Sequence, residues 1–192
     1  MTITKNKSAA FLFRSLICIC LFQLIALTAQ AQLSLSGGVT YDYSPSLSYG
    51  ERQDVGTLFS FFGDLEYQQI IGRLQFSSIL AGTFESGNLE SGYGIHGSLG
   101  YNFAPTEQLR IPVMLTAGGS FITYNNGFNG STSGSVFTDG SPQLGVTISP
   151  YYLLNEHFAL MGAFRYLKGF VATEQSQAID LTNLSLGIRF TL

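Results

Sequence analysis

Hydrophobic and polar residues alternate one by one along most of the chain, a pattern typical of β-strands whose two faces meet different surroundings. Helical periodicity is absent after residue 32. Each alternating segment has roughly the 9–11 residues that a tilted strand needs to cross a bilayer. There are eight such segments, at 33–43, 58–67, 73–85, 93–103, 109–121, 143–152, 158–167 and 183–192. The pattern therefore predicts an all-β protein built from eight strands.

The two faces of these segments differ in charge, and this difference indicates which face lies outside. The apolar faces hold no Asp, Glu, Lys, Arg or His, whereas the opposite faces combine small polar residues with eight charges. A Lys or Arg facing the bilayer midplane costs about 2–4 kcal/mol, so contact with lipid excludes charge. A soluble barrel of the lipocalin type would need a charged outer face, yet Lys168 is the only lysine after residue 32. We therefore expect an eight-stranded antiparallel up-and-down transmembrane β-barrel with its apolar face outward.

Composition agrees with this class. Of the 192 residues, 45% are hydrophobic and only 11% are charged, whereas soluble domains carry about 25% charged residues. The longest apolar run, from Ser15 to Ala29, is shorter than the roughly 20 residues of a spanning helix. A helical membrane protein and an ordinary cytosolic domain are therefore both disfavoured.

The first 31 residues have the features of a secretory signal peptide. A basic start with Lys5, Lys7 and Arg14 precedes an apolar stretch, and Ala29-Gln30-Ala31 fits the small-x-small cleavage rule. We expect cleavage after Ala31, which divides the chain into a signal peptide at 1–31 and a barrel domain at 32–192.

Removal of this segment would also remove both cysteines, Cys18 and Cys20. The remaining domain would have no disulfide and no cysteine metal site. It would keep six basic residues against twelve acidic ones, which leaves no basic patch for nucleic acid.

The connections between the predicted strands alternate in length. Short ones at 68–72, 104–108 and 153–157 alternate with long ones at 44–57, 85–92, 122–142 and 167–182. Bacterial barrels have short periplasmic turns and long outer loops. Under this threading the aromatic residues fall into two girdles at the membrane surfaces. The outer girdle is predicted to contain Tyr41, Tyr43, Phe59, Phe84, Tyr93, Phe121, Phe164 and Tyr166, and the periplasmic girdle Tyr67, Tyr101, Phe103, Tyr152, Phe158 and Phe190.

Four segments carry a resemblance to a known family: Ala29-Gln30-Ala31-Gln32, the strand start 109–113, the turn entry 149–152 and the C-terminal 187–192. With them, the chain resembles the small eight-stranded outer-membrane β-barrels of the OmpA/OmpX-like type, in a Bacteroidetes version. The resemblance implies export to the cell outer membrane and contact with its lipid and lipopolysaccharide. It also implies that the barrel-insertion machinery reads the last strand. That strand commonly ends in Phe in this family, whereas here Phe190 lies one pleat before Leu192.

The inward faces carry four acids and four bases, which we expect to pair because unpaired buried charges are costly. An eight-stranded interior is just wide enough for side chains to fill it. We therefore expect a plugged polar lumen, with a narrow pore as the alternative. The predicted lumen charge network is Asp42, Asp64, Glu66, Arg73, Glu85, Arg110, Arg165 and Arg189, centred in the periplasmic half on Asp64, Glu66, Arg73, Arg110 and Arg189.

His96 and Ser98 share one strand face and resemble the His-x-Ser pair of the outer-membrane lipid A deacylases. That family places a Glu about fourteen residues beyond the His, and here Arg110 holds the position. A triad needs a carboxylate that orients its His, and Glu85 or Glu90 would have to supply it from the neighbouring strand or loop. The sequence therefore predicts no enzyme, no cofactor and no metal site, and a structural or surface-interaction role whose surface partner the sequence does not identify. The deacylase remains the alternative, with His96 and Ser98 as its candidate catalytic residues.

Overall fold

The computed structural model describes residues 33–49, 52–84, 87–125, 136–171 and 177–192. The predicted signal peptide and Glu85 lie outside these residues. The described strands are β1 (Leu33–Tyr49), β2 (Arg52–Tyr67), β3 (Ile70–Phe84), β4 (Gly87–Phe103), β5 (Leu109–Asn125), β6 (Val136–Ile148), β7 (Tyr151–Leu153), β8 (Phe158–Gly169) and β9 (Ile179–Thr191). No helix within these residues is long and apolar enough to cross a membrane.

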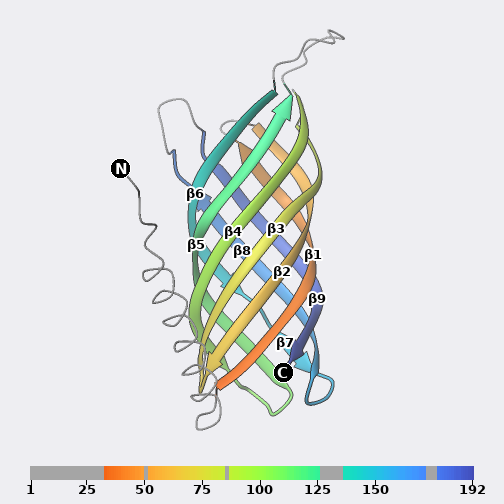
Figure 1. Ribbon diagram of the computed structural model, residues 1–192, viewed down its shortest axis with the longest axis vertical. Coiled ribbons are helices and arrows are strands. Elements are labelled where there is room, and N and C mark those ends of the chain that lie inside the picture. The colour runs from red at the N-terminus through yellow and green to blue at the C-terminus, as the bar shows by residue number, and fades with distance from the viewer. Residues whose placement is uncertain (1–32, 50–51, 85–86, 126–135, 172–176) are drawn as a thin grey trace, which may run out of the picture.

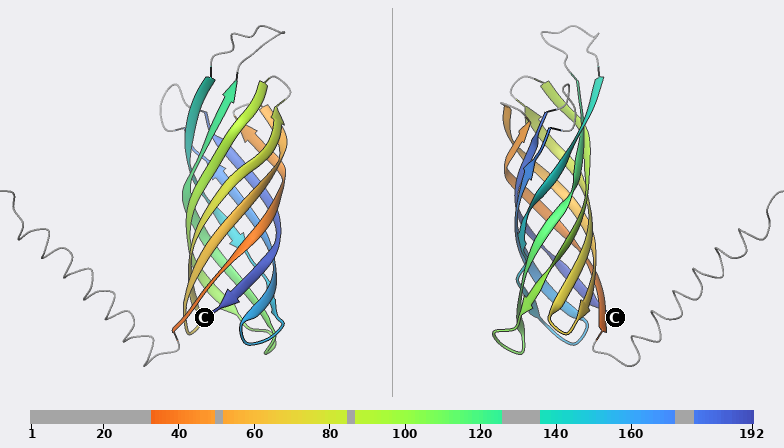
Figure 2. Two further views of the ribbon diagram at one scale, coloured as in Figure 1. Left: turned by 45° about the vertical axis from the view of Figure 1, so that its right-hand side comes forward. Right: turned by 90° about the vertical axis from the view of Figure 1, so that its left-hand side faces the viewer.

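The strands wind obliquely around a common axis and close into a barrel (Figures 1 and 2). All pairings are antiparallel, and β1 pairs with both β2 and β9, so no edge is left open between the first and last strands. A path through paired residues that starts at Ser36 returns to β1 at Leu47, which is the stagger that tilted strands produce. The path runs through Asp64, Arg73, Ser98, Thr116, Gly145, Leu167 and Leu181.

The short strand β7 continues β6 rather than adding a ninth strand to the wall. Both pair with β5 and with β8 in one unbroken register. The interruption falls at Ser149 and Pro150, opposite Pro112 on β5, where two prolines remove ladder donors. Ser149 N still donates to the Pro112 carbonyl at 2.9 Å, and Gly162 N to that of Pro150 at 2.9 Å. The prediction of an eight-stranded antiparallel barrel is therefore confirmed.

The two ends of the barrel differ. At the turn end, the short segments 68–69, 104–108 and 154–157 join consecutive strands. Both chain ends of the barrel lie there too, since Leu33 pairs with Tyr67 and Leu192 N donates to the Leu35 carbonyl. At the loop end, β1, β3, β5 and β8 finish and β2, β4, β6 and β9 begin. These two names are used below.

The strands extend much further toward the loop end than the sequence predicts. Strands β1 to β5 have 15 to 17 residues each. At about 3.3 Å per residue such a strand is roughly 50–55 Å long, more than an apolar band about 25 Å tall requires even with the usual tilt. Most described residues of the predicted connections at 44–57, 85–92, 122–142 and 167–182 therefore belong to strands, and these predicted connections are wrong there. Above the membrane a strand no longer needs an apolar outer face, so the alternation fades while the pairing continues.

The outer surface of the barrel is apolar and the interior is largely polar. Leu115, Leu186 and Leu74 are 70%, 75% and 65% exposed, whereas Ser36, Thr40 and Asp42 are at most 3% exposed. This confirms the predicted outward apolar face. The predicted girdle aromatics lie on this surface, although Phe59 is half-buried and the side chain of Phe84 lies outside the described residues. The rings of Phe76, Tyr93 and Phe121 stack across three strands, with centroids 6.4 and 5.0 Å apart.

Candidate functional site in the barrel interior

A cluster of four charged side chains occupies the interior at the turn end; we call Asp64, Glu66, Arg73 and Arg189 the charge cluster. Asp64 and Arg73 are paired residues on β2 and β3. Arg73 donates from Nε to Asp64 Oδ1 at 2.6 Å and from Nη2 to Oδ2 at 2.8 Å. Its Nη1 donates to Ser149 Oγ at 2.9 Å, and its guanidinium lies 4.3 Å from the ring centre of Phe62. Arg73 is therefore held on every side by a specific partner.

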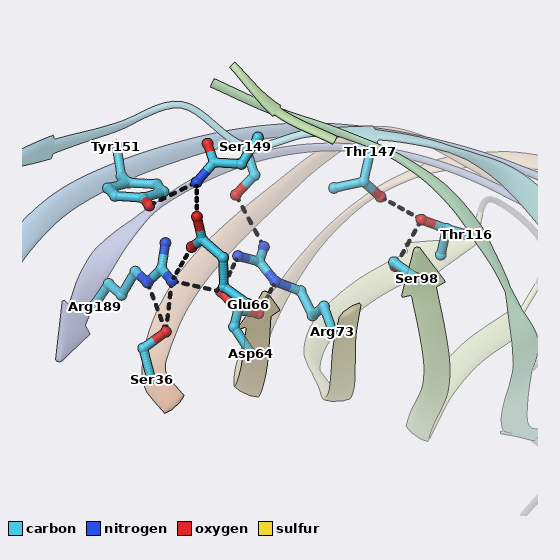
Figure 3. A network of polar contacts seen from close by, with 11 residues as sticks. Ser36, Asp64, Glu66, Arg73, Ser98, Thr116, Thr147, Ser149, Tyr151 and Arg189 are labelled. Carbon is cyan, nitrogen blue, oxygen red and sulfur yellow. Dashed lines mark hydrogen bonds and ion pairs between the residues drawn. The ribbon is translucent and has the colours of Figure 1, made fainter. Parts of the chain in front are cut away.

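Arg189 enters the cluster from the opposite side (Figure 3). Its Nε and Nη2 donate to Ser36 Oγ at 2.9 and 2.6 Å, and Nη2 lies 3.4 Å from Glu66 Oε2. The guanidinium stacks over Tyr151, 4.1 Å from the ring centre. Asn102 completes the arrangement by donating from Nδ2 to Glu66 Oε1 at 2.7 Å and to Tyr151 Oη at 3.0 Å.

The charge cluster is electrically balanced, with two carboxylates and two guanidinium groups. Such balance is needed because a buried ion without a partner costs several kcal/mol. Charge-assisted and bidentate hydrogen bonds of the kind formed by Arg73 offset that cost. The cluster thus spans the interior at the turn end with fixed polar contacts, and its partners Ser36, Asn102, Ser149 and Tyr151 were not singled out by the sequence analysis.

Arg110 does not belong to this cluster, contrary to the prediction. It lies at the start of β5, only partly buried, and its Nη1 donates to the Thr106 carbonyl at 3.0 Å. Alternation placed its side chain on the inward face, but at this strand end it lines a pocket at the mouth of the barrel.

The middle of the barrel holds the two other described lumen charges. Asp42 accepts from Ser60 Oγ at 2.5 Å, and Ser60 Oγ also lies 2.9 Å from Ser77 Oγ. Arg165 is 2% exposed. No ion pair between Asp42 and Arg165 forms within the described residues. These two charges therefore balance each other at longer range only, unlike the charge cluster.

His96 and Ser98 also lie in the middle, in two separate hydrogen-bonded groups. His96 Nε2 lies 2.8 Å from Gln143 Oε1, which also accepts from Ser120 Oγ at 2.7 Å. Ser98 Oγ contacts Thr116 Oγ1 at 2.8 Å. No carboxylate hydrogen-bonds to His96 within the described residues. Among the described residues, the hypothesised catalytic pair therefore has neither a mutual hydrogen bond nor an orienting acid.

A second interior feature lies at the loop end, and the sequence analysis missed it. Seven side chains, each at most 4% exposed, form one apolar cluster that we call the hydrophobic plug: Leu47, Tyr49, Leu58, Ile122, Leu167, Ile179 and Leu181. Some signal was present, since alternation places the apolar residues Leu58 and Leu167 on the inward faces of their strands.

The Asp139 carboxylate accepts hydrogen bonds from several segments at the rim above the hydrophobic plug. Its Oδ2 accepts from Tyr49 Oη at 2.8 Å and from Gln177 N at 3.0 Å, and its Oδ1 from Gly140 N at 2.8 Å. One carboxylate thus joins β1, β6 and the segment that precedes β9. Across the described chain, no group of His, Cys, Asp and Glu residues has a geometry that could hold a metal ion.

Solved structures with the same architecture come from several bacteria. Neisserial surface protein A shares 15% identity with a TM-score of 0.63, covering 83% of this chain and 97% of its own. A major outer membrane protein of Thermus thermophilus shares 12% identity with a TM-score of 0.57, covering 84% and 100%. The chain has the fold of the small outer-membrane β-barrels.

This small-barrel fold is also that of Ail, the attachment invasion locus protein of Yersinia pestis, whose structure holds the heparin analogue sucrose octasulfate. Ail shares 14% identity with a TM-score of 0.52, covering 83% of this chain and 97% of its own. No protein-family model and no curated protein sequence matches this chain. At these identities the small-barrel fold is the extent of the likeness.

Proposed function

We propose that this chain is an integral outer-membrane barrel that conducts no solute and acts through the surface at its loop end. The observation that supports the proposal is that packed side chains meet across the interior in two places, one near each end. The hydrophobic plug lies toward the loop end, and the charge cluster crosses the interior toward the turn end. An ion crossing this interior would have to break buried ion pairs and then enter an apolar constriction.

The apolar outer belt supports a location in lipid. Exposed Leu, Ile and Phe side chains on this scale would aggregate in water, whereas lipid accommodates them. The short turns at one end support placing the turn end in the periplasm and the loop end outside the cell. The C-terminal strand β9 closes the wall against β1, which fits its proposed reading by the barrel-insertion machinery.

The sequence segments around the loop end carry more acidic than basic residues, and this imbalance favours some surface partners over others. The segments around the loop end carry Glu51, Asp54, Glu90, Asp139, Glu174 and Asp180 against Arg52 and Lys168. A polyanion such as the sulfated ligand seen with Ail would be repelled by that balance. We therefore propose a neutral or cationic surface partner.

The conductance of the purified barrel tests the sealed interior. After reconstitution into a planar bilayer, we expect no steady single-channel steps, because the hydrophobic plug and the charge cluster would block an aqueous path between the two ends. The protein is delivered in lipid vesicles that fuse with the planar bilayer, and its folded state in these vesicles is verified by heat-modifiable migration on a denaturing gel. A large porin delivered in the same way serves as the positive control. Reproducible unit steps from the wild-type protein would contradict the proposal and support the narrow pore instead.

A further inference from the structure

A polar pocket opens at the turn end of the barrel, directly below the charge cluster. It has a volume of about 450 Å³ and is lined by Glu66, Gln68, Gln69, Asn102, Ala104 and Arg110. This volume lies within the roughly 300–1,000 Å³ range of small-molecule sites. The lining comes from the turn after β2, the end of β4 and the start of β5, so three connected parts of the wall converge on it.

Arg110 supplies an uncompensated positive charge at this pocket. The described interior charges balance without it, with Asp42, Asp64 and Glu66 set against Arg73, Arg165 and Arg189. Arg110 forms no ion pair within the described residues, and its hydrogen bond to the Thr106 carbonyl fixes the guanidinium at the rim. A planar guanidinium with free N–H groups is suited to binding a carboxylate in a bidentate manner.

The inner wall of the pocket offers acceptors instead. Asn102 is 2% exposed, and its Nδ2 is already committed to Glu66 and Tyr151. Its Oδ1 has no hydrogen-bond partner among the described residues. Beside it, the Glu66 carboxylate is only partly buried. Buried acceptors without a partner are uncommon in native proteins, so this wall is suited to a ligand that donates N–H groups.

The backbone conformation of Gln68, a residue that lines the pocket, is a further sign of a binding site. Gln68 has a φ of 56°, the only positive φ of a non-glycine residue among the described residues. Glycine or asparagine would occupy this turn position with less strain. The chain instead keeps a long amide side chain on the pocket lining, a local cost that is commonly found at binding sites.

We infer that this pocket binds a small ligand with an α-carboxylate and neighbouring N–H donors, namely an amino acid or the free C-terminal end of a peptide. Arg110 binds the carboxylate, and Glu66 and Asn102 accept from the ammonium or amide N–H groups. The inference goes beyond the proposed surface role, since it assigns a separate site at the opposite end of the barrel.

Titration of the purified barrel in nanodiscs with the dipeptide alanyl-alanine tests the inference by calorimetry. We expect saturable binding that weakens about tenfold or more in Arg110→Gln, because a charge-assisted contact is lost. Alanyl-alanine amide lacks the carboxylate, so it should bind the wild-type barrel as weakly as the dipeptide binds the Arg110→Gln variant. Glu107→Gln is the matched control, because Glu107 is exposed in the same turn but does not line the pocket. The Glu107→Gln barrel should therefore bind the dipeptide with the affinity of the wild type.

A parallel titration with free alanine separates the two sources of the ligand. Equal affinity for alanine and the dipeptide assigns the pocket to free amino acids, and tighter dipeptide binding assigns it to peptide ends. The inference is overturned if the wild type shows no saturable binding up to about 10 mM dipeptide, or if Arg110→Gln binds it as well as the wild type does. Neither result depends on whether the barrel conducts ions.

Discussion

Replacing Arg73 with methionine is expected to destabilise the barrel by about 3–5 kcal/mol, because the change leaves a buried carboxylate without its partner. The side chains of Arg73 and Asp64 are 2% and 0% exposed. Without Arg73, the nearest cation to Asp64 is Arg189, whose Nη2 lies 3.7 Å from Asp64 Oδ2 and is already shared with Ser36 and Glu66. The Asp64 side chain has no contact with bulk solvent that could replace the lost hydrogen bonds.

The free energy of unfolding can be measured by urea titration of the barrel in lipid vesicles. The chain contains no tryptophan, so circular dichroism and the mobility of unheated samples on a denaturing gel are the suitable signals. The double variant Asp64→Leu/Arg73→Met should recover most of the lost stability, because no unpaired charge remains and the apolar side chains fill similar space.

Lys168→Met is the matched control for this experiment. Lys168 pairs with Asp180 at 2.5 Å, but its side chain is 55% exposed. A pair in contact with water contributes little, so the urea midpoint should stay within experimental error. If Arg73→Met shifted the midpoint no more than Lys168→Met does, the charge cluster would not be a principal support of the turn end.

The barrel was predictable because one physical requirement, the exclusion of charge from contact with lipid, defines its outer surface. Lipid excludes charge from every outward position, so residues such as Leu74, Ile95 and Leu186 mark the outer face without any knowledge of the fold. Inside the barrel the demand is weaker, since polar, charged and apolar side chains can all be buried if they are satisfied. The composition of the inward face therefore predicted charges in the lumen that pair, but not which residues pair with which.

Two members of the hydrophobic plug, Leu47 and Tyr49, were missed because the register changes within β1. On β1, outward Tyr41 and Tyr43 precede an irregularity between Ser44 and Leu47. Simple alternation would place Leu47 and Tyr49 outward, but one extra residue at a β-bulge turns the following side chains to the other face. Both side chains are buried. A bulge of this kind leaves little trace in a single sequence beyond the Ser-Pro-Ser that accompanies it here.

Replacing Gly145 with alanine is expected to destabilise the barrel by about 3 kcal/mol or more, since the added Cβ would overlap neighbouring backbone. Gly145 on β6 faces the interior beside β8. An ideal Cβ there would lie 2.8 Å from the Tyr166 carbonyl carbon and 2.9 Å from Leu167 Cα, and it would overlap the Tyr166 carbonyl oxygen. Rotation of a side chain cannot relieve a backbone overlap, so β6 and β8 must separate and lose ladder hydrogen bonds.

The same substitution at Gly63 should have the opposite sign. Gly63 lies on the outer face of β2, and a Cβ there would meet no heavy atom within 4 Å. Alanine removes conformational freedom from the unfolded chain, so Gly63→Ala should stabilise the barrel by about 0.5–1 kcal/mol. Urea unfolding of both variants beside the wild type measures the contrast. Equal midpoints for the two would mean that β6 and β8 are not held in close contact at Gly145, and would count against the proposal of a sealed interior.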